Sequence, residues 1–130
     1  MITALTGDYA GSIVKPMKQS SIEAALDGGF LVLRLKGYFD KSSGNALVEE
    51  FERRLTNGVN RCLLDFSQIT IINSPGITCL LEFAENMRYE RKIPMGCIGI
   101  ADMYQEIFDA VGLSELITLF PNEAVARTSL

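Results

Sequence analysis

The chain has 130 residues, of which 48% are hydrophobic and 22% are charged, and a formal net charge of −4 at pH 7; this is typical of one domain with a substantial core. The acidic balance, without a clustered basic face, excludes a nucleic-acid-binding protein of the usual kind. No apolar run approaches the ~20 residues that cross a bilayer, and the chain begins without the positive start of a secretory signal, so we expect a cytoplasmic protein without membrane insertion.

The first part of the chain divides into a beginning without clear periodicity and a pair of strands. Glycines and a proline interrupt residues 1–19, which we expect to form an N-terminal tail or an extra short strand. The domain itself is expected over residues 20–130. Residues 22–26 and 30–35 have the composition of strands, and the Gly28-Gly29 pair between them favours a tight hairpin turn.

The next segment changes to helical spacing after residues 37–40 end the hairpin. We expect Ser42 or Ser43 to start this helix and Asn57-Gly58 to end it, because glycine permits the left-handed cap. Residues 61–66 follow as a nearly continuous apolar run, which predicts a strand buried on both faces. The helix has one apolar stripe, which consists of Leu47, Val48, Phe51 and Leu55.

A short segment, Asn73-Ser74-Pro75-Gly76, opens a second amphipathic helix that extends to Arg91. The sequence predicts that Ser74 is the N-cap, with its hydroxyl accepting from the free N–H groups of the first turn. Pro75 suits the first helical position, where a missing donor costs nothing. The same helix end carries about half a positive charge, which favours a phosphate on Ser74. Thr78 lies on the polar side of this helix.

The remaining elements repeat the alternation of strand and helix. Residues 95–100 predict a short strand. Asp102 and Gln105 resemble a capping box at the start of a third helix, which Gly112 ends. The last two expected elements are a strand over residues 116–120 and a short helix that Asn122 caps and that extends to Arg127.

The order of these elements is β-β-α-β-α-β-α-β-α. Strands separated by helices imply right-handed parallel crossovers, while the first hairpin adds an antiparallel strand. We therefore predict a single α/β domain, with a mixed, mostly parallel sheet of about four or five strands packed with about four helices. Ligands and partners of such sheets gather beyond the carboxyl ends of the strands, and Ser74 occupies such a position.

The side chains that commonly carry catalysis are scarce. The chain has no histidine, which removes the commonest general base and metal ligand. Its three cysteines, Cys62, Cys79 and Cys97, are far apart and lie in apolar elements, so we interpret them as small buried hydrophobic residues. No carboxylate pair has a spacing that demands acid–base chemistry. We expect a protein that is not an enzyme and that needs neither a metal nor a cofactor.

Four motifs in this order resemble the STAS family, the domains of sulfate transporters and anti-sigma-factor antagonists. The motifs are Gly37-Tyr38-Phe39-Asp40, Leu64-Asp65-Phe66-Ser67, Asn73-Ser74-Pro75-Gly76 and Phe108-Asp109-Ala110-Val111-Gly112-Leu113. The resemblance extends from about Met17 to the C-terminus, and it implies the same mixed α/β fold.

The resemblance implies a function as an anti-sigma-factor antagonist. In that family the unphosphorylated protein binds an anti-sigma factor, which is itself a serine kinase and inactivates the antagonist by phosphorylation. The matching serine is Ser74, and a phosphatase is a further expected partner. Asn73 replaces the aspartate that precedes the serine in many members, and Pro75 replaces a second serine. Asn73 can still form local hydrogen bonds, but it brings no charge.

The resemblance also implies a partner-binding surface around the phosphorylated serine. Asp40 and Asp65 have two interpretations, either as turn and strand-end residues or as acidic groups that shape this surface near Ser74. The residues expected to bind the partner are Asp40, Asp65, Asn73, Ser74, Pro75, Gly76 and Thr78.

An alternative function belongs to a different class. Some STAS domains act without phosphorylation, as interaction subunits of lipid-transport ATPases or in stressosome-like assemblies, and they use the same surface to hold a partner. An anti-sigma kinase gene beside this one would favour the first function, and an ABC-transporter operon would favour the second.

Overall fold

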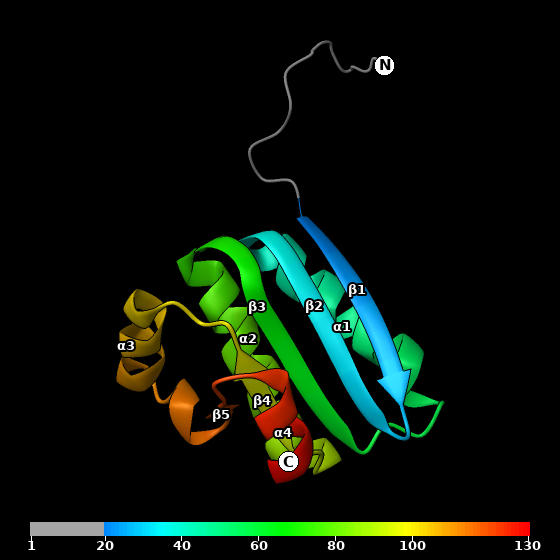
Figure 1. Ribbon diagram of the computed structural model, residues 1–130. Coiled ribbons are helices and arrows are strands. Elements are labelled where there is room, and N and C mark those ends of the chain that lie inside the picture. Colours follow the sequence, from blue (N-terminus) through cyan, green and yellow to red (C-terminus); the bar gives the residue numbers. More distant parts are fainter. Residues whose placement is uncertain (1–19) are drawn as a thin grey trace, which may run out of the picture.

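The computed structural model describes residues 20–130, which form one sheet with helices on both of its faces (Figure 1). The expectation for residues 1–19 lies outside the described residues. The strands are β1 (Ser20–Asp27), β2 (Phe30–Phe39), β3 (Arg61–Ile72), β4 (Met95–Ile98) and β5 (Thr118–Leu119). The helices are α1 (Lys41–Leu55), α2 (Ser74–Glu85), the π-helical segment η1 (Asn86–Arg91), α3 (Asp102–Ala110), the 3-10 turn η2 (Leu113–Glu115) and α4 (Glu123–Ser129).

The strands lie in the sheet in the order in which they occur in the chain. β1 pairs antiparallel with β2, and the pairs from β2 to β5 are all parallel. Right-handed crossovers that all advance in one direction put their helices on one face, so α1, α2 and α3 share a face and α4 covers part of the other (Figure 1). The predicted mixed α/β fold is confirmed.

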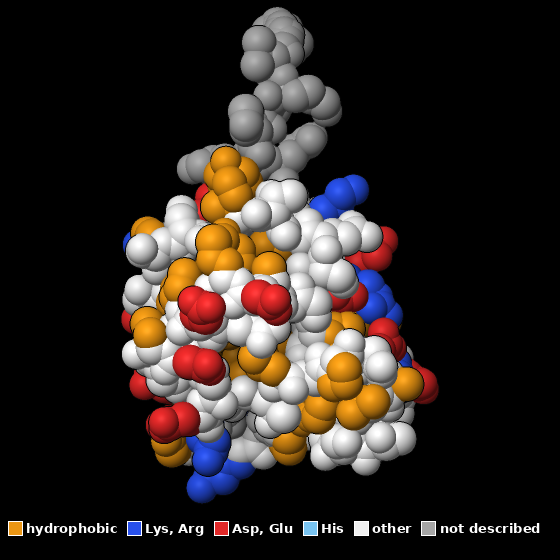
Figure 2. All heavy atoms as spheres, turned by 60° about the vertical axis from the view of Figure 1, so that its left-hand side comes forward, with side chains coloured by type: hydrophobic (Ala, Val, Ile, Leu, Met, Phe, Trp, Pro, Cys, Tyr) orange, Lys and Arg blue, Asp and Glu red, His pale blue; other side chains and the backbone are white. Residues whose placement is uncertain are grey.

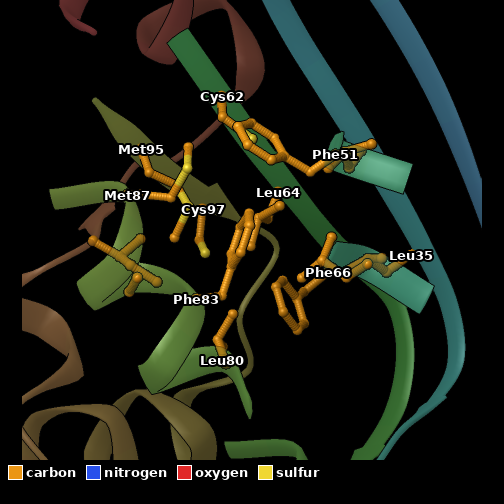
Figure 3. Close-up of a cluster of buried hydrophobic side chains, with 14 of the residues drawn as sticks. Leu35, Phe51, Cys62, Leu64, Phe66, Leu80, Phe83, Met87, Met95 and Cys97 are labelled. Atoms are coloured by element: carbon orange, nitrogen blue, oxygen red, sulfur yellow. The ribbon is translucent and has the colours of Figure 1, made fainter. Parts of the chain in front are cut away.

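The core lies mainly between the sheet and the three crossover helices. Figure 3 shows Cys62, Leu64 and Phe66 of β3 pointing toward Phe51 of α1 and Phe83 of α2. The side chains of neighbouring strand positions, such as Leu63, point to the opposite face and pack with Ala126 of α4. β2 and β3 are therefore buried on both faces over their first halves, as the apolar run of residues 61–66 predicts.

The buried cysteines behave as small hydrophobic residues. Cys62 and Cys97 lie fully within the core, and Cys79 is partly buried between α1 and α2. Burial disfavours the thiolate and raises the pKa of Cys62 to about 12, so this thiol stays protonated and inert. The interpretation of Cys62 and Cys97 as buried core residues is confirmed.

The β1–β2 hairpin is confirmed, and its second strand is longer than expected. Gly28 and Gly29 have φ angles of 57° and 85°, which the hairpin turn requires and which glycine adopts without strain. β2 does not end at Leu35 but continues through Phe39. Residues 37–39 of the motif that we expected to end the hairpin are thus still in the strand.

The third strand is also longer than the apolar run predicts. β3 continues beyond Phe66 to Ile72 and contains two β-bulges, where its register against β2 shifts between Arg34 and Lys36 and again between Gly37 and Tyr38. Each bulge places one extra residue in β3 and breaks the alternation of side chains. The sequence of this half of the strand therefore has no period of two, which is why its pattern did not predict a strand.

The predicted capping box at the start of α3 is wrong, and the predicted cap of α4 is confirmed. α3 has Ala101 as its N-cap, without a side-chain hydrogen bond, so Asp102 and Gln105 do not form a capping box. Gln105 instead donates to the backbone oxygen of Ile100, at 2.9 Å. Asn122 caps α4 as expected, because its side-chain oxygen accepts from the N–H of Val125 at 2.9 Å.

Candidate functional site

Two helices begin side by side at the carboxyl edge of the sheet. β2 and β3 end at the paired residues Phe39 and Ile72, and the next residue of each strand, Asp40 or Asn73, is the N-cap of the following helix. The N–H of Asn73 donates to the oxygen of Phe39 at 3.2 Å. This hydrogen bond joins the start of α2 to the start of α1, and it thereby fixes the position of Ser74, the residue after Asn73.

The start of α2 differs from the predicted one at its first two residues. Asn73 is the N-cap, with extended backbone angles of −95° and 172°, and its side-chain oxygen accepts from the N–H of Gly76 at 2.9 Å. Ser74 is the first helical residue, so the prediction that Ser74 caps the helix is wrong, and Pro75 takes the second position instead of the first. The amide oxygen of Asn73, and not the hydroxyl of Ser74, accepts the hydrogen bond from the first turn of the helix.

Ser74 therefore presents a hydroxyl that the fold does not use. Its side chain is exposed, and across residues 20–130 no hydrogen bond to its hydroxyl is formed. The backbone oxygen of Ser74 accepts from the hydroxyl of Thr78 at 3.2 Å. Since the first N–H groups of α2 lie at this end, the site combines an accessible nucleophilic oxygen with a positive local potential.

Gly76 fixes the distance between α2 and β2. A Cβ at this position would lie 2.2 Å from the backbone oxygen of Phe39, closer than any real contact. A similar close approach occurs one helix turn further on, where a Cβ on Gly44 of α1 would lie 2.5 Å from the Cβ of Cys79. The start of α2 is thus packed closely against the end of β2 and against Gly44 of α1, which holds Ser74 in a fixed position.

Asp40 has a structural function at the start of α1. Its carboxylate accepts from the N–H of Ser43 at 3.0 Å. The Ser43 hydroxyl shares its one proton between the backbone oxygen of Tyr38, at 2.7 Å, and the same carboxylate, at 3.0 Å. The expected start of this helix at Ser42 or Ser43 is therefore wrong by one or two residues. The structure brings Asp40 and Asn73 together at one edge and supports the interpretation of Asp40 as a turn residue.

Asp65 lies elsewhere in the molecule. It is inside β3, not at a strand end, and its carboxylate forms an ion pair with Arg34 at 3.0 Å. In the register of β2 and β3, Asp65 lies opposite Arg34, and Ile72 lies opposite Phe39, five residues further along β2. About 17 Å of sheet therefore separates Asp65 from the site. The structure does not bring Asp65 to Ser74.

The ion pair of Asp65 belongs to a network that attaches α4 to the sheet. Arg34 also binds Glu123 at 3.0 Å, and Glu123 binds Arg127 at 3.0 Å. Burial by itself raises the pKa of Asp65, but hydrogen bonds from Ser67 and Arg34 outweigh burial and leave the pKa below its ordinary value. The pKa of Glu123 is likewise lowered, because its hydrogen bonds with Arg34 and Arg127 outweigh burial.

Sequence reasoning missed an apolar part of this edge. Ile71, just before the site, is 41% exposed, and Met103 at the start of α3 is 60% exposed. The hydroxyl of Tyr104 accepts from the N–H of Ile72 at 3.1 Å, which holds the first turn of α3 against the end of β3. Ile71 faces outward because of the second bulge, and an apolar run gives no signal of such a reversal.

The described part of the chain offers no site for a metal. No group of three or more histidine, cysteine, aspartate or glutamate side chains is arranged to hold an ion within residues 20–130. In the same residues, no helix has the length and apolar character that a membrane-spanning helix needs. The polar groups at the edge around Ser74 are hydroxyls, the amide of Asn73, backbone N–H groups and the carboxylate of Asp40.

Comparison of the sequence with protein families identifies one domain. The family model described as STAS domain matches residues 21–126, which is almost all of the described chain. No curated protein matches the sequence significantly.

Comparison with solved structures finds the same fold at low sequence identity. An anti-sigma factor antagonist from Mycobacterium paratuberculosis has a TM-score of 0.72 at 16% identity, covering 89% of this chain and 97% of that chain. The anti-sigma factor antagonist SpoIIAA in its unphosphorylated form has a TM-score of 0.65 at 12% identity, over 83% and 97% of the chains. The Bacillus cell fate determinant SpoIIAA in the phosphorylated form has a TM-score of 0.64 at 14% identity, over 83% and 99%. These similarities show a shared fold.

Proposed function

The chain belongs to the STAS domain family, and from this premise we propose that it is an anti-sigma-factor antagonist that phosphorylation of Ser74 switches off. Unphosphorylated, it binds an anti-sigma factor and thereby frees a sigma factor. The anti-sigma factor is also the serine kinase, and a phosphatase restores the binding form. The chain itself performs no catalysis and needs no cofactor.

One observation carries this proposal, namely that the hydroxyl of Ser74 is exposed and has no structural task. Because Asn73 caps α2 at 2.9 Å, a kinase can modify Ser74 without removing a hydrogen bond that holds the fold. The product is compatible with the fold as well. A phosphate at the first residue of α2 lies at the positive end of the helix dipole.

The phosphate acts on the partner and leaves the fold intact. Ser74, Pro75 and Thr78 are exposed at the start of α2, and Asn73 is partly exposed beside them, so these residues are available to a partner surface. A dianionic group placed in such a contact must lose its water and meets a surface shaped for a neutral serine. Switches of this kind change affinity by about 5–150-fold, or roughly 1–3 kcal/mol.

A second candidate is an interaction subunit that works without phosphorylation. The observation that favours it is local sequence, since Asn73 and Pro75 stand where many family members have an aspartate and a second serine. The same helix start, with its rigid backbone, serves equally well as a permanent contact for a transport ATPase or a stressosome-like assembly.

The experiment that tests the proposal captures partners of the full chain from lysate with and without ATP. Mass spectrometry then identifies the partner and the modified residue. We expect an anti-sigma kinase that is captured without ATP and released with it, with the phosphate on Ser74. The matched control is Ser42→Ala, because Ser42 is also an exposed serine, in the first turn of the neighbouring α1.

Ser74→Ala should hold the partner in the presence of ATP, whereas Ser42→Ala should release it like the wild type. A phosphate on Ser67 or Thr70 would overturn the assignment of the site. A transporter or scaffold partner whose binding does not depend on ATP would favour the second candidate.

A further inference from the structure

The outer face of α3 carries two stripes of different chemistry. Asp102, Glu106 and Asp109 follow one another at intervals of four and three residues, which aligns them along the helix, and all three are exposed. Beside them, Met103, Ile107 and Ala110 have the same spacing and form an apolar stripe. Figure 2 shows acidic and hydrophobic side chains side by side on the face of the molecule that includes α3.

The apolar stripe is exposed at Met103 and Ala110, whereas Ile107 between them is half-buried. Met103 is 60% exposed and Val111, just beyond the helix, is 43% exposed. The opposite side of α3 is attached to the core through Phe108, which is fully buried. Exposed apolar groups beside a charged stripe are typical of a surface that contacts another protein.

The charge of this surface is not compensated. None of Asp102, Glu106 and Asp109 forms an ion pair within the part of the chain that the structure describes, and α3 contains no lysine or arginine. The acidic side chains of α1 differ, since Glu50 binds Arg53 and Arg54 and Glu52 binds Arg91. The carboxylates of Asp102 and Glu106 thus remain available to a partner, while that of Asp109 accepts a hydrogen bond from the hydroxyl of Ser114.

The two stripes on the outer face of α3 lie next to the candidate site. Tyr104 at its start is bonded to the N–H of Ile72, at 3.1 Å, and Asn73 and Ser74 follow directly. A hollow between the two elements is lined by Ile69, Ile72, Ile100 and Tyr104, among other residues. A partner that contacts Ser74 therefore reaches the first turn of α3 with little extension of its own surface.

The charge decides what occupies this surface. A second copy that met it around a two-fold axis would bring acidic stripes together, and nucleic acid or an anionic membrane would be repelled in the same way. A segment with the complementary pattern, basic residues beside an apolar stripe, satisfies both stripes. We propose that the α3 surface, formed by Asp102, Met103, Glu106, Ile107, Asp109 and Ala110, docks a basic amphipathic helix of a partner protein.

This inference rests on the proposed function in one respect, because it assigns the docked helix to the anti-sigma factor that binds at Ser74. The switch and the docking surface are separate features. The first concerns a single hydroxyl at the start of α2, and the second supplies affinity and selects the partner by charge, in the manner of a helix bound through spaced apolar anchors.

The test uses a designed helical peptide as the probe, so that it does not depend on an identified partner. The peptide has about four helical turns, with leucine at the spacing of one apolar stripe and lysine elsewhere. A second peptide has glutamate in place of every lysine. Amide chemical shifts of the full chain, recorded during titration with each peptide, locate the binding site and give the affinity.

We expect the lysine peptide to shift the amides of α3 and of Ile71 to Ser74, and the glutamate peptide to bind far more weakly. Met103→Ser and the double change Asp102→Asn with Glu106→Gln should each lower the affinity for the lysine peptide by at least about fivefold, which is the effect of removing a typical interface anchor. The matched controls are Tyr89→Ser, at an apolar residue that is 64% exposed on η1, and the double change Glu49→Gln with Glu82→Gln.

Equal weakening by the control charge variant would mean that the peptide responds only to net charge, and it would overturn the proposal. Shifts confined to α1 would overturn it as well. With the anti-sigma factor itself, binding that ignores the α3 variants but responds to Ser74 would leave the proposed function standing and remove the docking surface. Peptide binding at α3 without binding of any anti-sigma factor would leave the docking surface standing and overturn the proposed function.

Discussion

At the start of α2, capping of the helix and presentation of an exposed hydroxyl belong to two adjacent residues, whereas the sequence predicts both for Ser74. Asn73 accepts the hydrogen bond of the first turn and holds the helix end, while Ser74 presents its hydroxyl to solvent. An N-cap must have an extended backbone, and Asn73 has it because it is the residue that leaves β3. A modification of Ser74 is thus separated from the stability of the fold.

The division of tasks gives a prediction on stability. Asn73→Ala should lower the free energy of unfolding by about 1 kcal/mol, because a helix loses its N-cap. Ser74→Ala should change it by less than about 0.5 kcal/mol, because an exposed hydroxyl without a partner is removed. Denaturant unfolding of both variants measures the difference. A larger loss for Ser74→Ala than for Asn73→Ala would restore the serine as the cap.

Gly76 gives a second prediction at the same scale. Gly76→Ala should destabilise the chain by more than about 2 kcal/mol, because its Cβ would meet the oxygen of Phe39 at 2.2 Å and force α2 away from β2. The control is Gly58→Ala, at a position with a φ of 86° and open space around it, which should cost only about 1 kcal/mol of backbone strain. Thermal melting compares the two, and an equal loss would show that the close approach relaxes easily.

Among the elements, α4 is held by charged contacts as well as by burial. It packs one fully buried residue, Ala126, against the sheet, and Arg34 ties it to β3 through Glu123 and Asp65. The carboxylates of Asp65 and Glu123 have lowered pKa values in the folded chain. A lowered carboxyl pKa contributes stability at a pH above the ordinary unfolded value and loses it as the pH falls through the folded value.

The network therefore predicts a dependence of stability on pH. Between neutral pH and about pH 3, below the ordinary pKa of ~3.9 for aspartate, the wild type should lose more unfolding free energy than Asp65→Asn does. The difference should stay below about 1 kcal/mol, since the side chain of Arg34 is 41% exposed and solvent screens the pair. Urea unfolding at both pH values measures it. Glu49→Gln, on α1, is the control and should behave like the wild type.

For the molecule as a whole, periodicity and turn residues predict the order of elements but not their lengths. The glycine hairpin turn, the strand–helix alternation and the Asn122 cap follow from local chemistry that tertiary contacts do not change. The second half of β3 does not follow, because two bulges remove its period of two. The surroundings of Asp65 depend on which face of the sheet its side chain occupies, and the exposure of Met103 depends on how α3 packs against the core. Neither can be predicted from local sequence. The position of Ser74 at the carboxyl edge was predictable, whereas the capping residue was not, since Asn73 and Ser74 are both good caps.

The last prediction separates the fold from the switch through a single charge. In Ser74→Asp, the carboxylate sits at the first residue of α2, where the helix favours it by about 0.3–1 kcal/mol. The same charge should weaken binding of the anti-sigma factor, though less than a dianionic phosphate does. The variant is therefore expected to unfold at the same or a higher temperature than the wild type and yet to bind less tightly, whereas Ser74→Asn should match the wild type in affinity.

The control for this comparison is Ser42→Asp, which adds the same charge to the first turn of α1 without entering the proposed contact. It should gain similar stability and keep its affinity. Melting curves and titrations with the captured partner give both quantities for each variant. If Ser74→Asp and Ser42→Asp bind the partner equally well, charge at Ser74 does not control binding. The start of α2 would then be a rigid contact surface of the kind that an unphosphorylated interaction subunit uses.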